Sequence, residues 1–126
     1  MEKEFRISLP NQPGQLARVA EELGGEGVNI LAVAAIGAAS PLIVLVVDLE
    51  DKTREALKKL DLSFQEVELL TADVPHRPGE LGIFAKKMGD AGVNIESIYL
   101  LEESEGKVKV ALTVSDLNKA KQRLGL

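Results

Sequence analysis

The side chains best suited to bind a small charged molecule lie in two copies of one motif. The first copy, residues 13–30, is PGQLARVAEELGGEGVNI, and the second, residues 78–95, is PGELGIFAKKMGDAGVNI. The copies are offset by 65 residues without a gap and are identical at nine of eighteen positions. A repeat of about half the chain indicates a duplicated domain, so each copy is expected to offer the same kind of site.

The chemistry that these residues could perform is recognition of a carboxylate beside an ammonium group. A helix that begins at Pro13-Gly14 presents free amides and the positive end of its dipole to a carboxylate. Gly14 has no Cβ, so a ligand could approach the backbone. The amides of Asn11 and Asn29 offer both donors and acceptors, and Arg77 in the second copy could hold a carboxylate through two hydrogen bonds.

Structural roles for the same residues stay open at this stage. Pro-Gly is a common turn, and Asn11 or Asn29 can equally satisfy backbone amides of a turn. His76 can be an exposed loop residue and Arg77 a solvated charge. The sequence has one histidine and no cysteine, and no nucleophile, paired-carboxylate or metal-ligand pattern stands out. We therefore expect no catalytic residue, no metal and no cofactor, and a protein that is not an enzyme.

The elements that position these residues follow from the spacing of apolar side chains. Residues 5–9 alternate as a half-buried strand, with Glu4, Arg6 and Ser8 on the second face. Pro13 is expected at the first position of a helix. The apolar face of that helix has the i, i+3, i+4, i+7 spacing in both copies: Leu16, Val19, Ala20 and Leu23, then Leu81, Phe84, Ala85 and Met88.

The remaining elements give the order βαββαβ in the first half. Strands are expected at residues 28–36, 43–47 and 64–67, with a short helix before the last of these. The second half repeats the pattern with strands at 70–74, 95–101 and 108–114, a hairpin turn at 102–106 and a last helix, and it lacks the fourth strand. The fold class is α+β: two ferredoxin-like units, each an antiparallel sheet with helices on one face, at residues 1–67 and 68–126.

Composition narrows the function further. The 126 residues are 45% hydrophobic and carry a net charge of −5, which argues against a nucleic-acid partner. No apolar run approaches the length of a membrane span and the N-terminus has no apolar leader segment, so we expect a soluble, cytoplasmic protein without membrane contact.

Two other functions of the same fold are less well matched. RNA-binding versions place aromatic side chains on the central strands, where this sequence has aliphatic ones. An acylphosphatase-like enzyme could use Arg77 and Asn94, but the loop PGEL is not a glycine-rich phosphate cradle.

The motif resembles the ACT domain, the small-molecule sensing module of amino-acid metabolism. N-x-P-G-x-L followed by G-V-N-I matches in the first copy, and the second copy matches with His76 in place of the asparagine. The resemblance implies that such units pair side by side into a common sheet and bind an amino acid at their interface. The residues expected to contact the ligand are Asn11, Gln12, Gly14, Gln15, Leu16, Asn29 and Ile30 in the first copy and His76, Arg77, Gly79, Glu80, Leu81, Asn94 and Ile95 in the second.

The function expected from this resemblance is that of a tandem regulatory protein, which senses an amino acid and regulates an enzyme or pathway of amino-acid metabolism. The alternative is a structural adaptor subunit that binds no ligand and acts through protein contacts alone. Because the second unit lacks its last strand, residues 70–74 are expected to form an unpaired sheet edge. A twofold partner would cover such an edge, so we expect a homodimer.

Overall fold

The computed structural model describes residues 2–37 and 39–126. The chain folds into two compact units, Met1–Glu68 and Leu69–Leu126, which are called unit 1 and unit 2 here. The sequence-based boundary lies one residue earlier, between residues 67 and 68. Ala38, one of the small residues in the alanine-rich stretch after the first helix, lies outside the described residues. Each unit has its own sheet and its own core.

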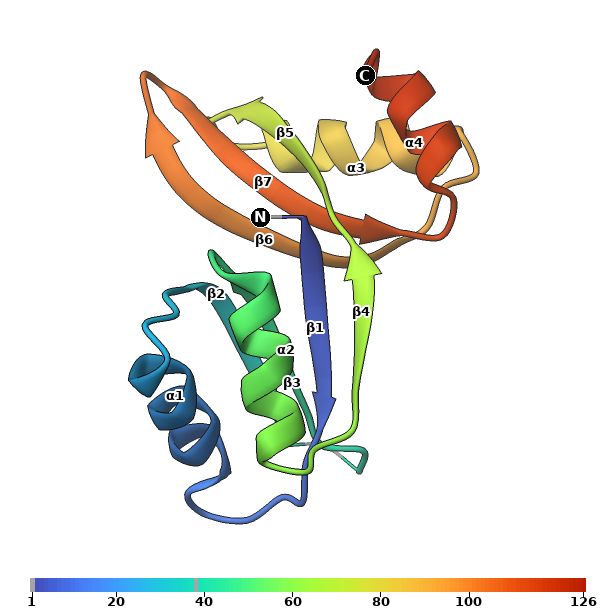
Figure 1. Cartoon of the computed structure of the whole chain (residues 1–126). Helices are drawn as coiled ribbons and strands as arrows, with labels where there is room; N and C mark the ends of the chain where they lie inside the picture. Colours follow the sequence, from blue (N-terminus) through green and yellow to red (C-terminus); the bar gives the residue numbers. More distant parts are fainter. Residues whose placement is uncertain (1, 38) are drawn as a thin grey trace. The chain divides into compact units, whose positions relative to one another are not determined.

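Unit 1 is a four-stranded antiparallel sheet with two helices on one face (Figure 1). The strand order is β2-β3-β1-β4. The elements are β1 (Lys3–Ser8), α1 (Gln15–Gly25), β2 (Ile30–Ile36), β3 (Leu42–Val47), α2 (Glu50–Lys59) and β4 (Phe64–Glu68). The continuous apolar run of β3 is central, between β2 and β1, as its composition predicts.

The core of unit 1 joins alternate residues of the strands to one stripe of each helix. Phe5 and Ile7 of β1 are fully buried and meet Val19 of α1 and Leu57 of α2. The predicted alternation of β1 is therefore confirmed for its apolar face. Glu4, which the alternation assigns to a polar second face, is also fully buried, and Arg6 Nε donates a hydrogen bond of 2.6 Å to its carboxylate. Alternation shows which residues share a face but not whether the second face meets water.

The start of α1 differs from the prediction. The helix begins at Gln15 and its N-cap is Gly14, so Pro13 lies in the preceding turn and is not the first helical residue. Leu16, expected on the buried face, is 41% exposed, whereas Val19 and Leu23 are buried. The buried stripe of α1 therefore begins one turn later than the apolar spacing predicts.

Unit 2 repeats the arrangement with three strands in the order β5-β7-β6. Its elements are β5 (Leu70–Pro75), α3 (Glu80–Asp90), β6 (Ile95–Ser104), β7 (Lys107–Val114) and α4 (Leu117–Leu124). Both helices contribute to one core with the sheet, through Phe84 and Met88 of α3 and Ala120 of α4. The prediction of α+β units, the second with three strands, is confirmed.

The hairpin between β6 and β7 is tighter than predicted. The strands run to Ser104 and from Lys107, which leaves only Glu105 and Gly106 as the turn instead of residues 102–106. Both turn residues have positive φ, 53° and 76°. Two successive residues with positive φ match the twist of the flanking strands in a two-residue hairpin turn. Glutamate is uncommon at the first position of such a turn, so the sequence predicts a longer turn.

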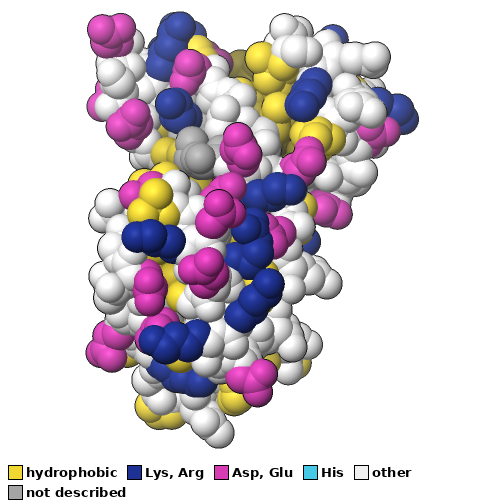
Figure 2. All heavy atoms as spheres, viewed as in Figure 1, with side chains coloured by type: hydrophobic (Ala, Val, Ile, Leu, Met, Phe, Trp, Pro, Cys, Tyr) yellow, Lys and Arg dark blue, Asp and Glu magenta, His cyan; other side chains and the backbone are white. Residues whose placement is uncertain are grey.

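Charged side chains of both signs are interspersed on the molecular face shown in Figure 2. The ion pairs of unit 1 include Lys59 with Glu22 at 3.0 Å. Within the described residues, none of the helices has the length and apolar character needed to cross a membrane.

Candidate ligand site

A small pocket lies at one end of unit 1, at the turn that precedes α1. Its volume is about 150 Å³, and it is called the turn pocket here. The lining comes from the turn and the first residues of α1, the end of β2 and the start of β3: Leu9, Pro10, Asn11, Gln12, Gln15, Leu16, Ala35, Ile36, Gly37, Pro41, Leu42 and Ile43. Four of the seven residues proposed from the sequence in the first copy therefore line one cavity.

Gly14 shapes the turn through its backbone. Its φ is +88°, in the left-handed region, and Gly79 has the same conformation with φ +86°. A Cβ at either glycine would meet no atom within 4 Å, so conformation rather than space requires glycine at these positions. Within the described residues, no side chain caps the first amides of α1.

The side chain of Gln15 is the unusual polar group of the pocket. Its Oε1 atom is buried and accepts no hydrogen bond from the described residues. Asn11 lies close by on the pocket wall: its Oδ1 is 3.2 Å from the position that a Cβ on Gly37 would occupy. Gly37 thus lets the Asn11 amide lie against the end of β2.

Asn29 and Ile30 are not brought to the turn pocket. They stand at the start of β2, whereas the pocket is lined by the end of that strand, a separation of about 20 Å at 3.3 Å per residue. Asn29 Nδ2 donates a hydrogen bond of 2.9 Å to Asp48 Oδ2, and its backbone amide donates one of 2.8 Å to Asp48 Oδ1. The hydrogen bond from the Asn29 side chain, followed by that from its backbone, lowers the pKa of Asp48 below 3.8.

The matching turn of unit 2 differs in its charges. Arg77 stands where the first copy has Gln12, and Glu80 where it has Gln15. Arg77 Nη2 donates a hydrogen bond of 2.8 Å to Glu80 Oε1, so the two charges satisfy each other at the start of α3. His76 is exposed and its backbone amide donates a hydrogen bond of 2.9 Å to Gly106 O.

The other predicted residues of the second copy lie apart from one another. Leu81 is 41% exposed on the first turn of α3. Asn94 and Ile95 stand at the opposite end, where the Asn94 amide donates to Ser115 Oγ at 2.9 Å and Ile95 packs on the core. Whether either set contacts a ligand stays a prediction.

None of the pocket residues from β2 and β3 is among the ligand contacts proposed from the sequence. Ala35, Ile36 and Gly37 lie beside Leu42 and Ile43 because the two strands form a hairpin, with Ala35 opposite Ile43 and Ile36 opposite Leu42. The turn residues between the strands were a usable signal, since a hairpin there brings its two ends together near the helix start. Among the described residues, no group of three or more histidine, cysteine, aspartate or glutamate side chains could hold a metal ion.

Two successive ferredoxin-like units, each with the P-G-x-L turn before its first helix, define the class as a tandem ACT fold. The resemblance to the ACT domain is confirmed at the level of the fold by solved structures. Protein BT0572 from Bacteroides thetaiotaomicron is similar with a TM-score of 0.86 and 27% identity, over 98% of this chain and 85% of that one.

Two further structures with a similar fold belong to aspartate kinases. The ligand-free regulatory subunit of aspartate kinase from Thermus thermophilus has a TM-score of 0.68 and 18% identity, over 98% of this chain and 91% of that one. A structure of aspartokinase alpha and beta subunits has a TM-score of 0.69 and 17% identity, over 98% and 89%. Sequence identities of 17% and 18% show that these chains share the fold, and they show nothing beyond it. No family model matches the chain, and no curated protein sequence matches it.

Proposed function

We propose that the chain binds an amino acid in the turn pocket of unit 1 and thereby regulates an enzyme of amino-acid metabolism. The observation that carries this proposal is the buried, unpartnered Oε1 atom of Gln15. A buried acceptor without a donor costs about 1–3 kcal/mol of stability. A ligand that donates a hydrogen bond would remove that cost on binding, and the ammonium group of an amino acid is such a donor.

The rest of the pocket supports the same class of ligand. The uncapped amides at the start of α1 and the positive end of its dipole favour a carboxylate. Leu9, Leu42 and Ile43 supply an apolar wall, and the volume of about 150 Å³ limits the ligand to a small molecule. The two polar ends and one apolar wall correspond to the three parts of an α-amino acid.

We further propose one site per chain. At the equivalent position of unit 2, Glu80 places a negative charge in the first turn of α3 and pairs with Arg77. A ligand carboxylate there would meet like charge and would compete with an existing ion pair. Gln15 is neutral, so unit 1 keeps the favourable end of the helix for the ligand.

A second copy of the chain is proposed to complete the site along β2, the edge strand of unit 1. Leu31, Val33 and Ile36 are 46%, 47% and 53% exposed, which is unusual for three apolar residues of one strand. Twofold pairing of β2 with its copy is antiparallel, so the start of one strand lies beside the end of the other. Asn29 and Ile30 of the second copy would then reach the pocket that they cannot reach in their own unit.

The regulatory part of the proposal is supported by two solved structures with a similar fold. One is the regulatory subunit of aspartate kinase from Thermus thermophilus, and the other contains the alpha and beta subunits of an aspartokinase. The chain would act as a sensing part that changes the activity of an enzyme. The effector and the enzyme are to be found by experiment.

The test is calorimetry and thermal unfolding of the chain with each of the twenty amino acids. Binding at 100-fold excess over Kd should stabilise the protein by about 2.7 kcal/mol. Gln15→Met is the decisive variant, because it replaces the unpartnered acceptor by an apolar side chain of similar length. It should raise the unfolding temperature of the free protein and weaken amino-acid binding at least tenfold.

The matched control is Glu80→Met, which changes the same position of unit 2 and should leave the affinity unchanged. Val33→Glu should convert a dimer into a monomer in sedimentation velocity and weaken binding as well. If no amino acid binds, or if Gln15→Met binds with full affinity, the sensing proposal is wrong and the adaptor function becomes the better one.

A further inference from the structure

We propose that the turn pocket of unit 1 selects small neutral amino acids, namely glycine, alanine and serine. This inference rests on the proposed function, since it names the class of amino acid that the same pocket binds. It is drawn from the volume of the pocket, from the neutral lining among the residues that the structure describes, and from the place of Leu16 in the pocket wall.

The volume of the pocket limits the number of ligand atoms. The pocket measures about 150 Å³. An apolar protein cavity of about 150 Å³ holds one benzene molecule, which has as many non-hydrogen atoms as alanine. Glycine is one atom smaller and serine one atom larger, whereas branched and longer side chains exceed this size. The pocket therefore fits the ammonium group, the carboxylate and a very short side chain.

The lining of the pocket limits the charge of the ligand. Its polar side chains are the amides of Asn11, Gln12 and Gln15, and no charged residue is among the lining residues that the structure describes. A second carboxylate or ammonium group on the ligand would lose its hydration and find no ion partner in this lining. A hydroxyl group differs, because an amide can donate a hydrogen bond to it or accept one from it. Acidic and basic amino acids are therefore disfavoured, and serine is accepted.

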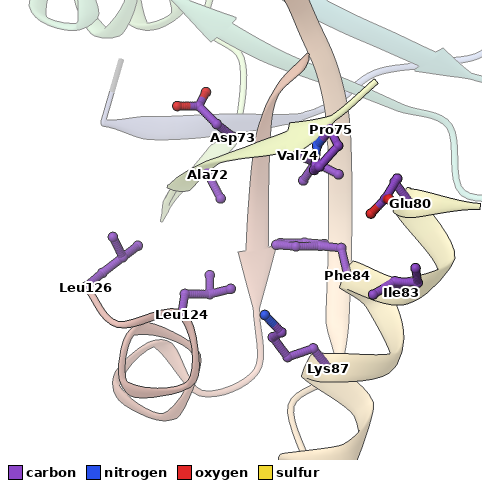
Figure 3. A pocket seen from close by; sticks show the side chains of 10 residues that line it. All are labelled: Ala72, Asp73, Val74, Pro75, Glu80, Ile83, Phe84, Lys87, Leu124 and Leu126. Carbon is purple, nitrogen blue, oxygen red and sulfur yellow. The ribbon is translucent and has the colours of Figure 1, made fainter. Parts of the chain in front are cut away.

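A cavity of unit 2 has the opposite kind of lining (Figure 3). It lies beside β5 and α3 and measures about 300 Å³. Glu80 and Lys87 line it together with apolar side chains such as that of Phe84. In Figure 3, the Lys87 side chain extends from α3 toward Leu124. This cavity offers twice the volume and both signs of charge, so the limits on size and charge belong to the turn pocket and not to the chain as a whole.

Leu16 is placed to set the size limit. It lines the pocket from the first turn of α1 and is 41% exposed. Ile36 lines the pocket from the end of β2 and is 53% exposed, so the pocket is open to solvent at these residues in the single chain. In the proposed pairing of two β2 strands, the second copy covers Ile36. A ligand side chain that exceeds the pocket would then meet Leu16 or the second copy instead of water.

The test is calorimetric titration of the full chain with glycine, alanine, serine, valine and leucine. Valine should bind at least tenfold more weakly than alanine, since a change of one methylene in an apolar pocket already alters binding by about 10–200-fold. Leucine should not bind. The compound 2,3-diaminopropionate has the size of serine but carries an ammonium group in place of the hydroxyl, so it isolates the effect of charge. It should bind at least tenfold more weakly than serine.

Leu16→Ala is the decisive variant, because it removes side-chain atoms from the wall of the pocket, and it should bind valine as tightly as alanine. The matched control is Leu49→Ala, which shortens a leucine of unit 1 that is 42% exposed and lies outside the pocket lining. It should keep the preference for alanine. Ala35→Val makes the opposite change at the wall and should favour glycine over alanine and serine. Circular dichroism and sedimentation velocity check the fold and the oligomeric state of each variant.

Two results would overturn this inference and leave the proposed function standing. Valine, leucine or 2,3-diaminopropionate could bind as tightly as alanine and serine, with Gln15→Met weakening that binding, which would place the larger or charged ligand in the turn pocket. Alternatively, Leu16→Ala could keep the full preference for alanine over valine, which would show that Leu16 sets no limit. If no amino acid binds, or if Gln15→Met binds with full affinity, the proposed function is wrong and the inferred selectivity is wrong with it.

Discussion

At the scale of single residues, two glycines before helices carry a conformation that other residues adopt at a cost. Gly14 and Gly79 have φ near +90° in both copies of the turn. The open space around them means that the side chain itself would be tolerated, so the cost of substitution is conformational.

Gly14→Ala should lower the free energy of unfolding by about 1–2 kcal/mol, because alanine is strained in the left-handed region. Gly79→Ala should cost a similar amount, since the conformation is the same. Gly14→Asn should cost less, because asparagine tolerates this region better. Urea unfolding of the three variants makes the comparison. A fully stable Gly14→Ala would show that the turn changes conformation freely.

At the scale of elements, Asn29 and Asp48 tie the start of β2 to the segment between β3 and α2. The bonds lower the pKa of Asp48 in the folded protein relative to its ordinary value of 3.8. The Asp48 carboxyl of the unfolded chain therefore binds a proton more readily than that of the folded protein. The stabilisation that the two hydrogen bonds to Asp48 provide is fully present above pH 3.8, and it is lost as the pH falls through the lower pKa of the folded protein.

Asn29→Ala should raise the pKa of Asp48 toward its ordinary value, though not fully, because the backbone amide of residue 29 still donates to the carboxylate. Carboxyl-carbon NMR titration of Asp48 measures the shift. Ser115→Ala is the matched control in unit 2, where the acceptor is a hydroxyl that does not titrate in this range. It should leave the acid part of the stability profile unchanged. An unmoved Asp48 titration in Asn29→Ala would contradict the assigned cause.

The elements were largely predictable, and their mutual placement was not. Apolar spacing located every strand and helix, because alternation and the helical stripe are local properties of the sequence. The turn pocket depends on the register that sets Ala35 opposite Ile43, which local patterns do not contain. For the same reason, Asn11 and Asn29 looked like one site in the sequence although a whole strand separates their positions in the unit.

At the scale of the whole molecule, the chain has two cores that share no residue. One is made by residues of unit 1, such as Leu57, and the other by residues of unit 2, such as Leu112. Both leucines are fully buried. Each core is therefore closed by side chains of its own unit.

Leu57→Ala should destabilise unit 1 by about 2–5 kcal/mol, through lost burial and the cavity left behind. Hydrogen exchange of the amides of β1, β3 and β4 should then become faster, while β5 and β7 keep their protection. Leu112→Ala should produce the reverse pattern. Equal loss of protection in both units from either variant would show that the two cores unfold together.

The difference between Gln15 and Glu80 has a practical consequence for measurement. Under the proposed function, one chain holds a responsive and an unresponsive copy of the same turn, attached to each other in a fixed one-to-one ratio. Temperature, salt and denaturant act on both turns, so their influence largely cancels when the signal of one turn is divided by that of the other. What remains is the effector alone, which would make the duplicated chain a ratiometric reporter with its own internal reference.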